Sequence, residues 1–261
     1  MINGVLNVWK EAGFTSHDVV AKLRGILHQK KIGHTGTLDP DATGVLPVCI
    51  GKGTRLCDML TDETKTYEAL LHLGIATDTQ DMSGTVTAEA PVTVTEEEVR
   101  DCIASFVGEN QQVPPMYSAL KVDGRKLCDL ARAGVTVERA ARPVHIFSIE
   151  ILSIELPRVR MRVCCSKGTY IRTLCQDVGE VLGCGACMES LLRTRVGEFA
   201  LADAIKLSEV EAYVIAHRSD ATETEEMQLP FLQAVDTVFL KYESATVDGQ
   251  FRKYLYNGNR L

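Results

Sequence analysis

The sequence predicts an α+β fold built on a mixed, largely antiparallel sheet. Apolar runs and capped helical segments follow one another without the regular strand–helix–strand order of a doubly wound parallel sheet. Residues 144–152 and 159–165 have the pattern of an antiparallel hairpin. The 261 residues are 45% hydrophobic and 24% charged. This composition is ordinary for a folded globular chain and excludes disorder, collagen and coiled coil as the main description.

The first half of the chain is predicted to alternate strands with helices. The strands are apolar runs bounded by turn residues, at 5–9, 45–50 and 66–73. Each helix is predicted where a capping or turn residue precedes apolar side chains at helical spacing, at Ser16, Gly53 and Thr95. Glu98 follows Thr95 at the spacing of a capping box, which supports the third of these helices.

Two stretches are predicted to lie outside regular structure. Residues 33–44 hold three glycines and a proline and lack apolar periodicity, so we expect a loop there. Residues 110–143 are rich in proline, glycine and basic residues, which predicts a long excursion from the sheet. A helix is expected after the hairpin, over 169–182, with its buried face formed by Tyr170, Leu174, Val178 and Val181.

Charge is distributed unevenly along the chain. The net charge is −7, which by itself argues against a nucleic-acid partner. However, residues 61–120 hold 2 basic and 11 acidic residues, whereas residues 121–200 hold 13 basic and 9 acidic ones. A polyanion responds to the local field, so a basic face is compatible with an acidic chain. A mixed solvated surface explains the same counts equally well.

Cysteine usage and the absence of membrane signals predict a cytoplasmic protein. No apolar stretch approaches the roughly 18 residues that cross a bilayer, and the first residues lack the pattern of a signal peptide. The nine cysteines are an odd number, which favours reduced thiols over a disulfide framework. Cys184 and Cys187 have the spacing of a metal or redox pair. Because no second Cys/His pair lies nearby, structural thiols are favoured, and zinc or redox chemistry is the alternative.

Asp39 is a candidate for chemistry in the 33–44 loop. It precedes Pro40, and a residue before proline is held extended. Glycines on both sides allow another backbone or a ligand to approach closely. Asp39 is therefore predicted to be fixed on a loop that opens to a cleft. The alternative is that Asp39 and Asp41 are ordinary turn residues and His34 is an incidental surface histidine.

Further candidates lie near other element ends. Arg172 lies in the first turn of the helix after Gly168, where a cation needs a carboxylate or phosphate partner; a surface pairing is the alternative. Tyr67 lies on a predicted strand, where a half-buried core role competes with catalysis. One predicted strand alternates arginines with apolar residues, giving a cationic face that either contacts phosphate or is merely exposed, at Arg158, Arg160 and Arg162.

A set of motifs follows in order along the chain, from about residue 1 to 205. The motifs are Gly33-His34-Thr35-Gly36-Thr37-Leu38-Asp39-Pro40, Thr43-Gly44-Val45-Leu46-Pro47, Lys65-Thr66-Tyr67, Gly74 with Thr77-Asp78-Thr79, Asp81 and Gly84, Gln112-Val113-Pro114-Pro115 with Tyr117-Ser118-Ala119 and Lys121, Gly168-Thr169-Tyr170-Ile171-Arg172-Thr173-Leu174, and Leu191-Leu192-Arg193-Thr194 with Gly197. These motifs resemble, in the same order, those of the bacterial TruB-type tRNA pseudouridine synthases. The resemblance favours the functional interpretation of Asp39, Arg172 and Tyr67, and it leaves both interpretations of the cationic strand open.

The resemblance implies a fold and a reaction. The fold is the pseudouridine synthase fold, with a mixed, largely antiparallel central sheet flanked by helices and a thumb-like insertion at about 112–143. The reaction is the isomerisation of uridine-55 in the T loop of tRNA to pseudouridine. The N1–C1′ bond breaks, the uracil turns, and C5 bonds to C1′. The base is tucked into the tRNA elbow and must be flipped out first. No metal or organic cofactor is implied.

The resemblance also implies roles for individual residues. Asp39 matches the catalytic aspartate, the nucleophile, and the sequence leaves open whether it attacks C1′, adds to C6 or abstracts a proton. Arg172 matches an arginine that pairs with it and keeps it charged. Tyr67 matches a tyrosine that stacks on the uracil and is a candidate to move the C5 proton. Other substrate contacts are expected at His34, Tyr170, Leu191, Lys10, Lys121, Arg132 and Arg193.

The chain departs from the family pattern in a few places. The family often has Lys-Pro where this chain has Lys10-Glu11, a thumb tyrosine where Cys128 stands, and a histidine near Cys187. The cationic excursion still matches the thumb that closes on RNA, through Lys121, Arg125, Lys126, Arg132, Arg139 and Arg142. None of these departures affects Asp39, Tyr67 or Arg172.

The C-terminal part is expected to be a small appendage. Residues 1–218 are expected to form the catalytic domain, and 219–261 a linker with part of a PUA-like RNA-binding module. Residues 219–226 are polar and acidic, as in a linker, and 231–256 are expected to hold short strands. A truncated or reduced module predicts weaker tRNA binding with an intact chemical step.

The expected partner is the T stem-loop of tRNA, with no membrane, no obligatory protein partner and a monomeric state. Two alternatives remain open. One is the catalytic subunit of a guide-RNA-dependent pseudouridylation complex, which shares the aspartate motif; the short basic segments and the intact thumb argue against it. The other is a non-enzymatic tRNA-binding folding factor, which would be indifferent to Asp39→Asn.

Overall fold

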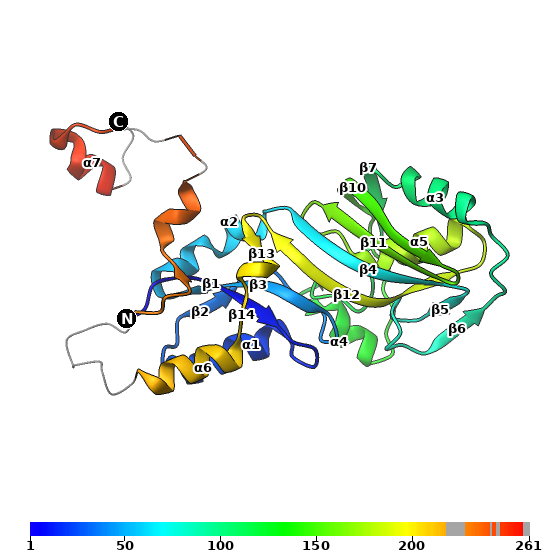
Figure 1. Cartoon of the computed structure of the whole chain (residues 1–261), viewed down its shortest axis with the longest axis horizontal. Helices are drawn as coiled ribbons and strands as arrows, with labels where there is room; N and C mark the ends of the chain where they lie inside the picture. Colours follow the sequence, from blue (N-terminus) through cyan, green and yellow to red (C-terminus); the bar gives the residue numbers. More distant parts are fainter. Residues whose placement is uncertain (218–227, 241, 244–245, 258–261) are drawn as a thin grey trace.

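One large curved sheet runs through the body of the protein in the computed structural model, which describes residues 1–217, 228–240, 242–243 and 246–257 (Figure 1). In the described residues the main path of the sheet is β14-β1-β3-β12-β4-β11-β10-β7, with β2, β13 and β15 attached to it. The strands are β1 Gly4–Lys10, β2 Ile32–His34, β3 Thr43–Ile50, β4 Lys65–Leu73, β7 Gly108–Gln112, β10 Arg142–Glu155, β11 Arg158–Cys165, β12 Ala186–Val196, β13 Phe199–Ala200, β14 Ile205–Lys206 and β15 Leu232–Gln233.

The sheet is mixed and largely antiparallel, as the sequence predicts. Parallel pairing occurs between β1 and β14 and between β3 and β12, and the other pairs of the sheet are antiparallel. Two small hairpins lie outside it, β5 Ile75–Thr77 with β6 Val86–Glu89 and β8 Lys121–Val122 with β9 Arg125–Lys126. The 144–152/159–165 hairpin is confirmed as β10 and β11.

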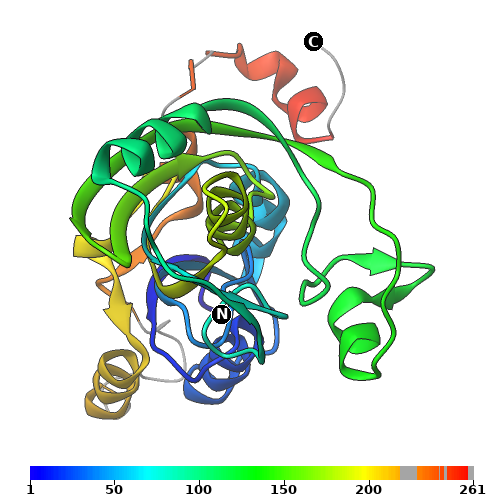
Figure 2. The same cartoon turned by 90° about the vertical axis from the view of Figure 1, so that its right-hand side faces the viewer.

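Helices pack on the sheet in two groups. The helices are α1 Ser16–Ile26, α2 Cys57–Thr61, α3 Glu96–Ser105, α4 Leu127–Arg132, α5 Ile171–Val181, α6 Leu207–Ala216 and α7 Arg252–Tyr256. α1 and α6 cover β1 and β3 and bury one core between them. α5 lies in the concave face of the other half of the sheet, against β4, β11 and β12, and forms the second core (Figure 2). None of the described helices is long and apolar enough to cross a membrane.

These two cores are joined by the loop between β2 and β3, and a third, smaller core includes Val5 of β1, Val45 of β3 and Leu60 of α2. The Leu38 and Ala42 side chains of the loop are buried in the second core, although the loop starts and ends on strands beside the first. The thumb segment, residues 113–141, leaves the sheet after β7 and returns at β10. Figure 2 shows it, in green, standing beside the body of the protein with α4 in it.

Most elements occur where the sequence predicts them, with differences at the ends. The first helix is capped by Thr15, not Ser16, because Thr15 and Asp18 form the capping box. The capping box of Thr95 and Glu98 is confirmed. The prediction that Val181 is buried is wrong. It is 66% exposed, because it lines an open depression rather than packing against the sheet.

The region from residue 186 onward differs most from expectation. The sequence predicts neither the long strand β12 nor α6. It predicts short strands in 231–256, whereas among the described residues of that range β15 is the only strand, and 3-10 turns and α7 make up much of the rest. Long-range pairing explains β15, since Leu232 pairs with Leu6 of β1. The predicted linker at 219–226 lies outside the described residues.

Candidate active site

The loop that carries Asp39 is fixed on two sides. On one side Leu38 N–H donates a hydrogen bond of 2.9 Å to Ser16 Oγ at the start of α1. On the other side the ammonium of Lys10 donates to the carbonyls of Pro40 and Ala42, at 2.8 and 2.6 Å. Lys10 is completely buried. It is therefore a support of the Asp39 loop, and the expected contact of this side chain with RNA is not available in the structure.

Gly44 brings the loop against β12. Its φ of +105° lies in the region that favours glycine. A Cβ at this position would collide with the backbone of Arg193, which is the register partner of Gly44 in the parallel pair of β3 and β12. Glycine at the end of the loop is what allows the loop and β12 to come together at the site.

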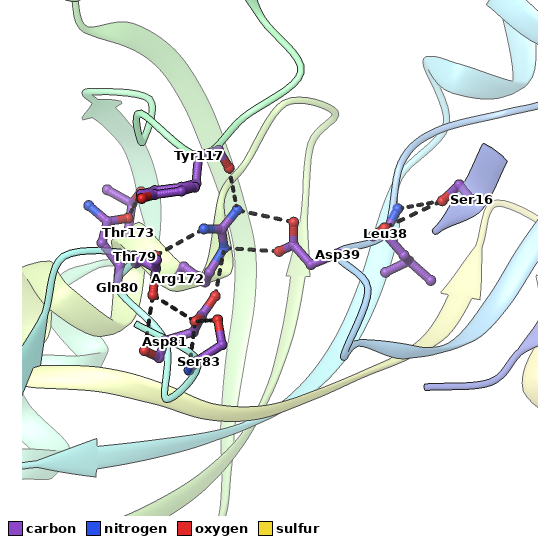
Figure 3. Close-up of polar contacts among 10 residues, drawn as sticks. All are labelled: Ser16, Leu38, Asp39, Thr79, Gln80, Asp81, Ser83, Tyr117, Arg172 and Thr173. Carbon is purple, nitrogen blue, oxygen red and sulfur yellow. Dashed lines mark hydrogen bonds and ion pairs between the residues drawn. The ribbon is translucent and has the colours of Figure 1, made fainter. Parts of the chain in front are cut away.

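Arg172 pairs with Asp39 through an ion pair and a hydrogen bond (Figure 3). Nε forms the ion pair, 2.9 Å from one carboxylate oxygen, and Nη2 donates the hydrogen bond to the other at 3.1 Å. The remaining donors bind backbone carbonyls, Nη1 that of Thr79 at 2.9 Å and Nη2 that of Tyr117 at 2.8 Å. The Arg172 side chain is 5% exposed and that of Asp39 is 36% exposed. The guanidinium is thus held from several sides while the carboxylate faces an opening.

Asp81 is a second acidic residue beside Arg172, and the sequence alone assigns it no role of its own. Its carboxylate lies 3.6 Å from Arg172 Nε. The carboxylate is held in place by Thr79 Oγ1 at 2.8 Å and Ser83 N–H at 3.0 Å. No local signal in the sequence identifies this role, because Asp81 and Arg172 lie far apart in the chain and meet only in the fold.

A cavity of about 390 Å³ lies in front of the Asp39–Arg172 pair. Its lining includes most of the residues that the motifs single out: Asp39, Tyr67, Tyr170, Arg172, Leu191 and Arg193. They come from the β2–β3 loop, β4, the start of α5 and β12, and so the fold brings together segments that lie far apart in the chain. The cavity also contains Ser118 and Leu120 of the thumb segment.

The surroundings of Asp39 in the cavity shift its pKa away from that of an ordinary aspartate. Burial raises the pKa of Asp39 above its usual value, and the nearby Asp81 charge acts in the same direction. The Arg172 guanidinium lowers the pKa, and Lys10 does so more weakly. The expectation that Arg172 favours the charged form agrees with this direction of its effect. The net pKa is nevertheless raised, so ionisation of Asp39 depends on its partners.

Tyr67 and Arg193 both line the cavity. Burial raises the pKa of Tyr67, and the positive charge of Arg193 opposes the rise. Arg193 is almost completely buried and donates from Nε to the Val45 carbonyl at 2.7 Å. Its Nη2 has no hydrogen-bond partner among the described residues. A buried donor without a partner is costly.

The other expected contacts lie away from the cavity. His34 is half-buried, with Nδ1 3.1 Å from the Gly36 carbonyl, and burial lowers its pKa, which favours the neutral ring. Lys121 and Arg132 are exposed on the thumb segment, and Arg132 lies 3.8 Å from Asp129. These residues are not brought to Asp39 in the structure, so a contact with RNA there would involve a wider surface.

The cationic strand face is partly neutralised. Arg158 pairs with Glu189 at 2.7 Å, and Arg162 pairs with both Glu68 and Glu150. Paired arginines are poor candidates for phosphate contacts, so the structure favours the interpretation as an exposed charged face.

Cys184 and Cys187 are both buried free thiols. Among the described residues no group of three or more His, Cys, Asp or Glu side chains is arranged to hold a metal ion. The metal alternative for this cysteine pair therefore finds no further ligands in the described part of the chain.

Comparison with protein families defines the chain as a pseudouridylate synthase. Residues 24–171 match the model of the TruB family pseudouridylate synthase N-terminal domain, and residues 172–245 match that of the tRNA pseudouridylate synthase B C-terminal domain. The chain therefore belongs to the TruB family, and it is an isomerase.

Similar proteins support this assignment. The tRNA pseudouridine synthase B of Lachnoclostridium phytofermentans is 53% identical over 268 residues, covering 100% of this chain and 84% of that protein. That of Alkaliphilus oremlandii is 47% identical, with coverage of 100% and 83%. A solved Cbf5-Nop10-Gar1 complex matches with a TM-score of 0.67 and 37% identity, covering 84% of this chain but only 57% of the matched chain.

Proposed function

We propose that this chain is a stand-alone enzyme that converts uridine-55 in the T loop of tRNA to pseudouridine. The substrate class is supported by relatives named tRNA pseudouridine synthase B that align with all of this chain. The observation that carries the chemistry is the Asp39–Arg172 pair, which presents a carboxylate at a cavity of about 390 Å³. A cavity of this size suits a single flipped base rather than a duplex.

In the proposed reaction Asp39 is the nucleophile. A carboxylate must be ionised to attack carbon, and Arg172 stabilises that form against the raised pKa. The attack is on C1′ of the ribose or on C6 of the base, and both positions lie on the nucleotide that enters the cavity. Overall no water is consumed, so the cavity must exclude water while the detached uracil turns.

The remaining cavity residues are proposed to hold the base. Tyr67 provides a ring for stacking, an interaction worth about 1–3 kcal/mol per base, and it is the candidate to move the C5 proton. Tyr170 and Leu191 line the walls. Arg193 also lines the cavity and places a positive charge beside Tyr67.

RNA outside the cavity is proposed to be held by a wider basic surface. Lys121 and Arg132 of the thumb segment are exposed, and the segment borders the cavity through Ser118 and Leu120. His34 lies on the short strand β2 that leads into the Asp39 loop. We propose that it helps hold the flipped nucleotide out of the T loop.

The test of this proposal is Asp39→Asn, with Asp41→Asn as the control. Asp41 is an exposed carboxylate on the same loop, so its loss changes the local charge equally. Asp39→Asn is expected to abolish pseudouridine formation in a T-stem-loop RNA and to leave affinity within about tenfold, or 1.4 kcal/mol. Asp41→Asn is expected to remain active. Activity retained in Asp39→Asn would remove Asp39 from the mechanism.

One alternative has a specific observation in its favour. Two solved complexes that contain Cbf5 share the fold at 32% and 37% identity, and Cbf5 is named there together with other proteins. A catalytic subunit of that kind would be inactive on a bare T-stem-loop, whereas a stand-alone synthase modifies it without protein partners. A tRNA-folding factor would be unaffected by Asp39→Asn, so the same experiment separates all three.

A further inference from the structure

The two ends of the thumb segment meet the body of the protein at one pair of residues. β7 ends at Gln112, β10 begins at Arg142, and these two residues are partners in the antiparallel ladder. Every residue between them belongs to the excursion that carries α4. A movement of the thumb segment relative to the sheet therefore acts directly on Gln112, the residue from which the segment starts.

The side chain of Gln112 binds the residue from which α5 starts. Its amide oxygen accepts a hydrogen bond from Tyr170 N–H at 3.0 Å, and its amide nitrogen donates to the Tyr170 carbonyl at 3.2 Å. Gln112 is 3% exposed, so water competes little for either bond. Tyr170 is the N-cap residue of α5, and its own side chain makes no capping hydrogen bond. The backbone at the start of α5 is thus fixed by a side chain from β7.

Two residues of the catalytic cavity depend on this backbone. The Tyr170 side chain lines the cavity, and Arg172 follows in the first turn of α5. Arg172 also donates to the Tyr117 carbonyl of the thumb segment at 2.8 Å. The start of α5 is therefore bound at two points, to Gln112 of β7 through Tyr170 and to Tyr117 of the thumb segment through Arg172. The second of these points is a member of the Asp39–Arg172 pair.

We propose that Gln112 is a positioning residue that fixes Tyr170 and Arg172 relative to Asp39, and so links the placement of the thumb to the geometry of the catalytic pair. The proposal rests on the proposed function, because it assigns Gln112 a part in the same reaction. Gln112 does not line the cavity, so it acts through its two neighbours. Misplacement of such groups by about 1 Å costs on the order of a hundredfold in rate.

The variant that tests this is Gln112→Met, with Gln111→Met as its control. Methionine is close to glutamine in length and volume but has no amide, so the change removes the hydrogen bonds and keeps the packing. Gln111 is the exposed neighbour on the same strand. α5 keeps its other anchors in the variant, since Thr173 Oγ1 still donates to Gln80 Oε1 at 2.9 Å. A thermal unfolding scan verifies that the variant is folded.

The first measurement needs no activity. It is an NMR titration of the Asp39 carboxyl in the free protein, on which Arg172, Asp81 and Lys10 are the charged groups that act. Gln112→Met is expected to raise the Asp39 pKa, because Arg172 is no longer held beside the carboxylate. Gln111→Met is expected to leave the pKa at its value in the parent chain. An Asp39 titration that is the same in Gln112→Met as in the parent would overturn the proposal.

The second measurement is the single-turnover rate of pseudouridine formation in a T-stem-loop RNA at saturating concentration. Gln112→Met is expected to lower the rate by about tenfold or more and to leave RNA affinity within about threefold. Combined with Arg172→Lys, it is expected to have a smaller effect than it has alone, because the part of its effect that passes through Arg172 is already lost. Equal losses in both backgrounds would reduce Gln112 to a general stabiliser of the fold and reject the proposal.

The two measurements also separate this proposal from the proposed function. A parent chain that forms no pseudouridine, but whose Asp39 pKa rises in Gln112→Met, would reject the function and support the positioning role. A parent chain that is active, with Gln112→Met indistinguishable from Gln111→Met in both titration and rate, would reject the positioning role alone.

Discussion

Arg172→Lys is expected to lower the rate of the chemical step by about a hundredfold. The guanidinium serves both oxygens of Asp39 and the carbonyls of Thr79 and Tyr117, which lie in different directions around it. A lysine ammonium carries its three donors on one atom and does not reproduce a planar fork. At least two of the four contacts are therefore lost in the variant.

The magnitude follows from the contacts. A hydrogen bond to a charged group contributes about 1.5–3 kcal/mol. The lower end applies here, because the Asp39 side chain is 36% exposed and water screens part of the interaction. Two lost contacts then amount to roughly 3 kcal/mol, which corresponds to about a hundredfold in rate.

The assay is single-turnover conversion of uridine to pseudouridine in a T-stem-loop RNA at saturating concentration, so that binding does not contribute. Arg158→Lys is the control, because Arg158 is about half exposed and makes a single surface ion pair with Glu189. Its rate is expected to equal that of the parent chain. A rate for Arg172→Lys within about threefold of the parent would refute the reasoning, because the fork geometry would then be unnecessary.

Two further changes test the surroundings of this pair. Asp81→Asn is expected to move the acid limb of the pH–rate profile to lower pH, because the charge of Asp81 raises the pKa of Asp39. With that charge removed, Asp39 stays ionised at lower pH. An acid limb that moves to higher pH would contradict this. Lys10→Met is expected to lower the free energy of unfolding by about 1–3 kcal/mol, because the ammonium no longer donates hydrogen bonds to three backbone carbonyls. Denaturant unfolding measures the loss, and Lys30→Met, which removes an exposed lysine, is expected to lose far less.

The sequence predicted the elements that depend on local signals. The capping box of Thr95 and Glu98 is a contact between residues three apart, and α3 starts where that pattern places it. The exposed Val181 shows the limit of such signals. Helical spacing places it on the buried face of α5, but spacing does not reveal where a helix extends beyond the elements that cover it.

The pairing of Asp39 with Arg172 lies beyond local pattern. An aspartate before proline predicts a fixed carboxylate, and an arginine in a first helical turn predicts a missing partner, but nothing local joins the two. They are 133 residues apart, and only the resemblance to a family connected them in advance. The contact of Asp81 with Arg172 was not predicted, because the motif that contains Asp81 implied no role for this residue.

The reason these distant residues meet lies in the way the two cores are joined. Asp39 comes from a loop anchored by α1 and Lys10 beside the first core, whereas Arg172 comes from a helix embedded in the second. The parallel pairing of β3 with β12 joins these halves, and Gly44 makes it close enough for the loop to reach the cavity. The same loop buries Leu38 and Ala42 in the second core together with Ile171 and Leu174 of α5. The alignment of the carboxylate with the guanidinium is therefore set both by packing in that core and by the pairing of β3 with β12, and small shifts between the halves act directly on the reactive pair.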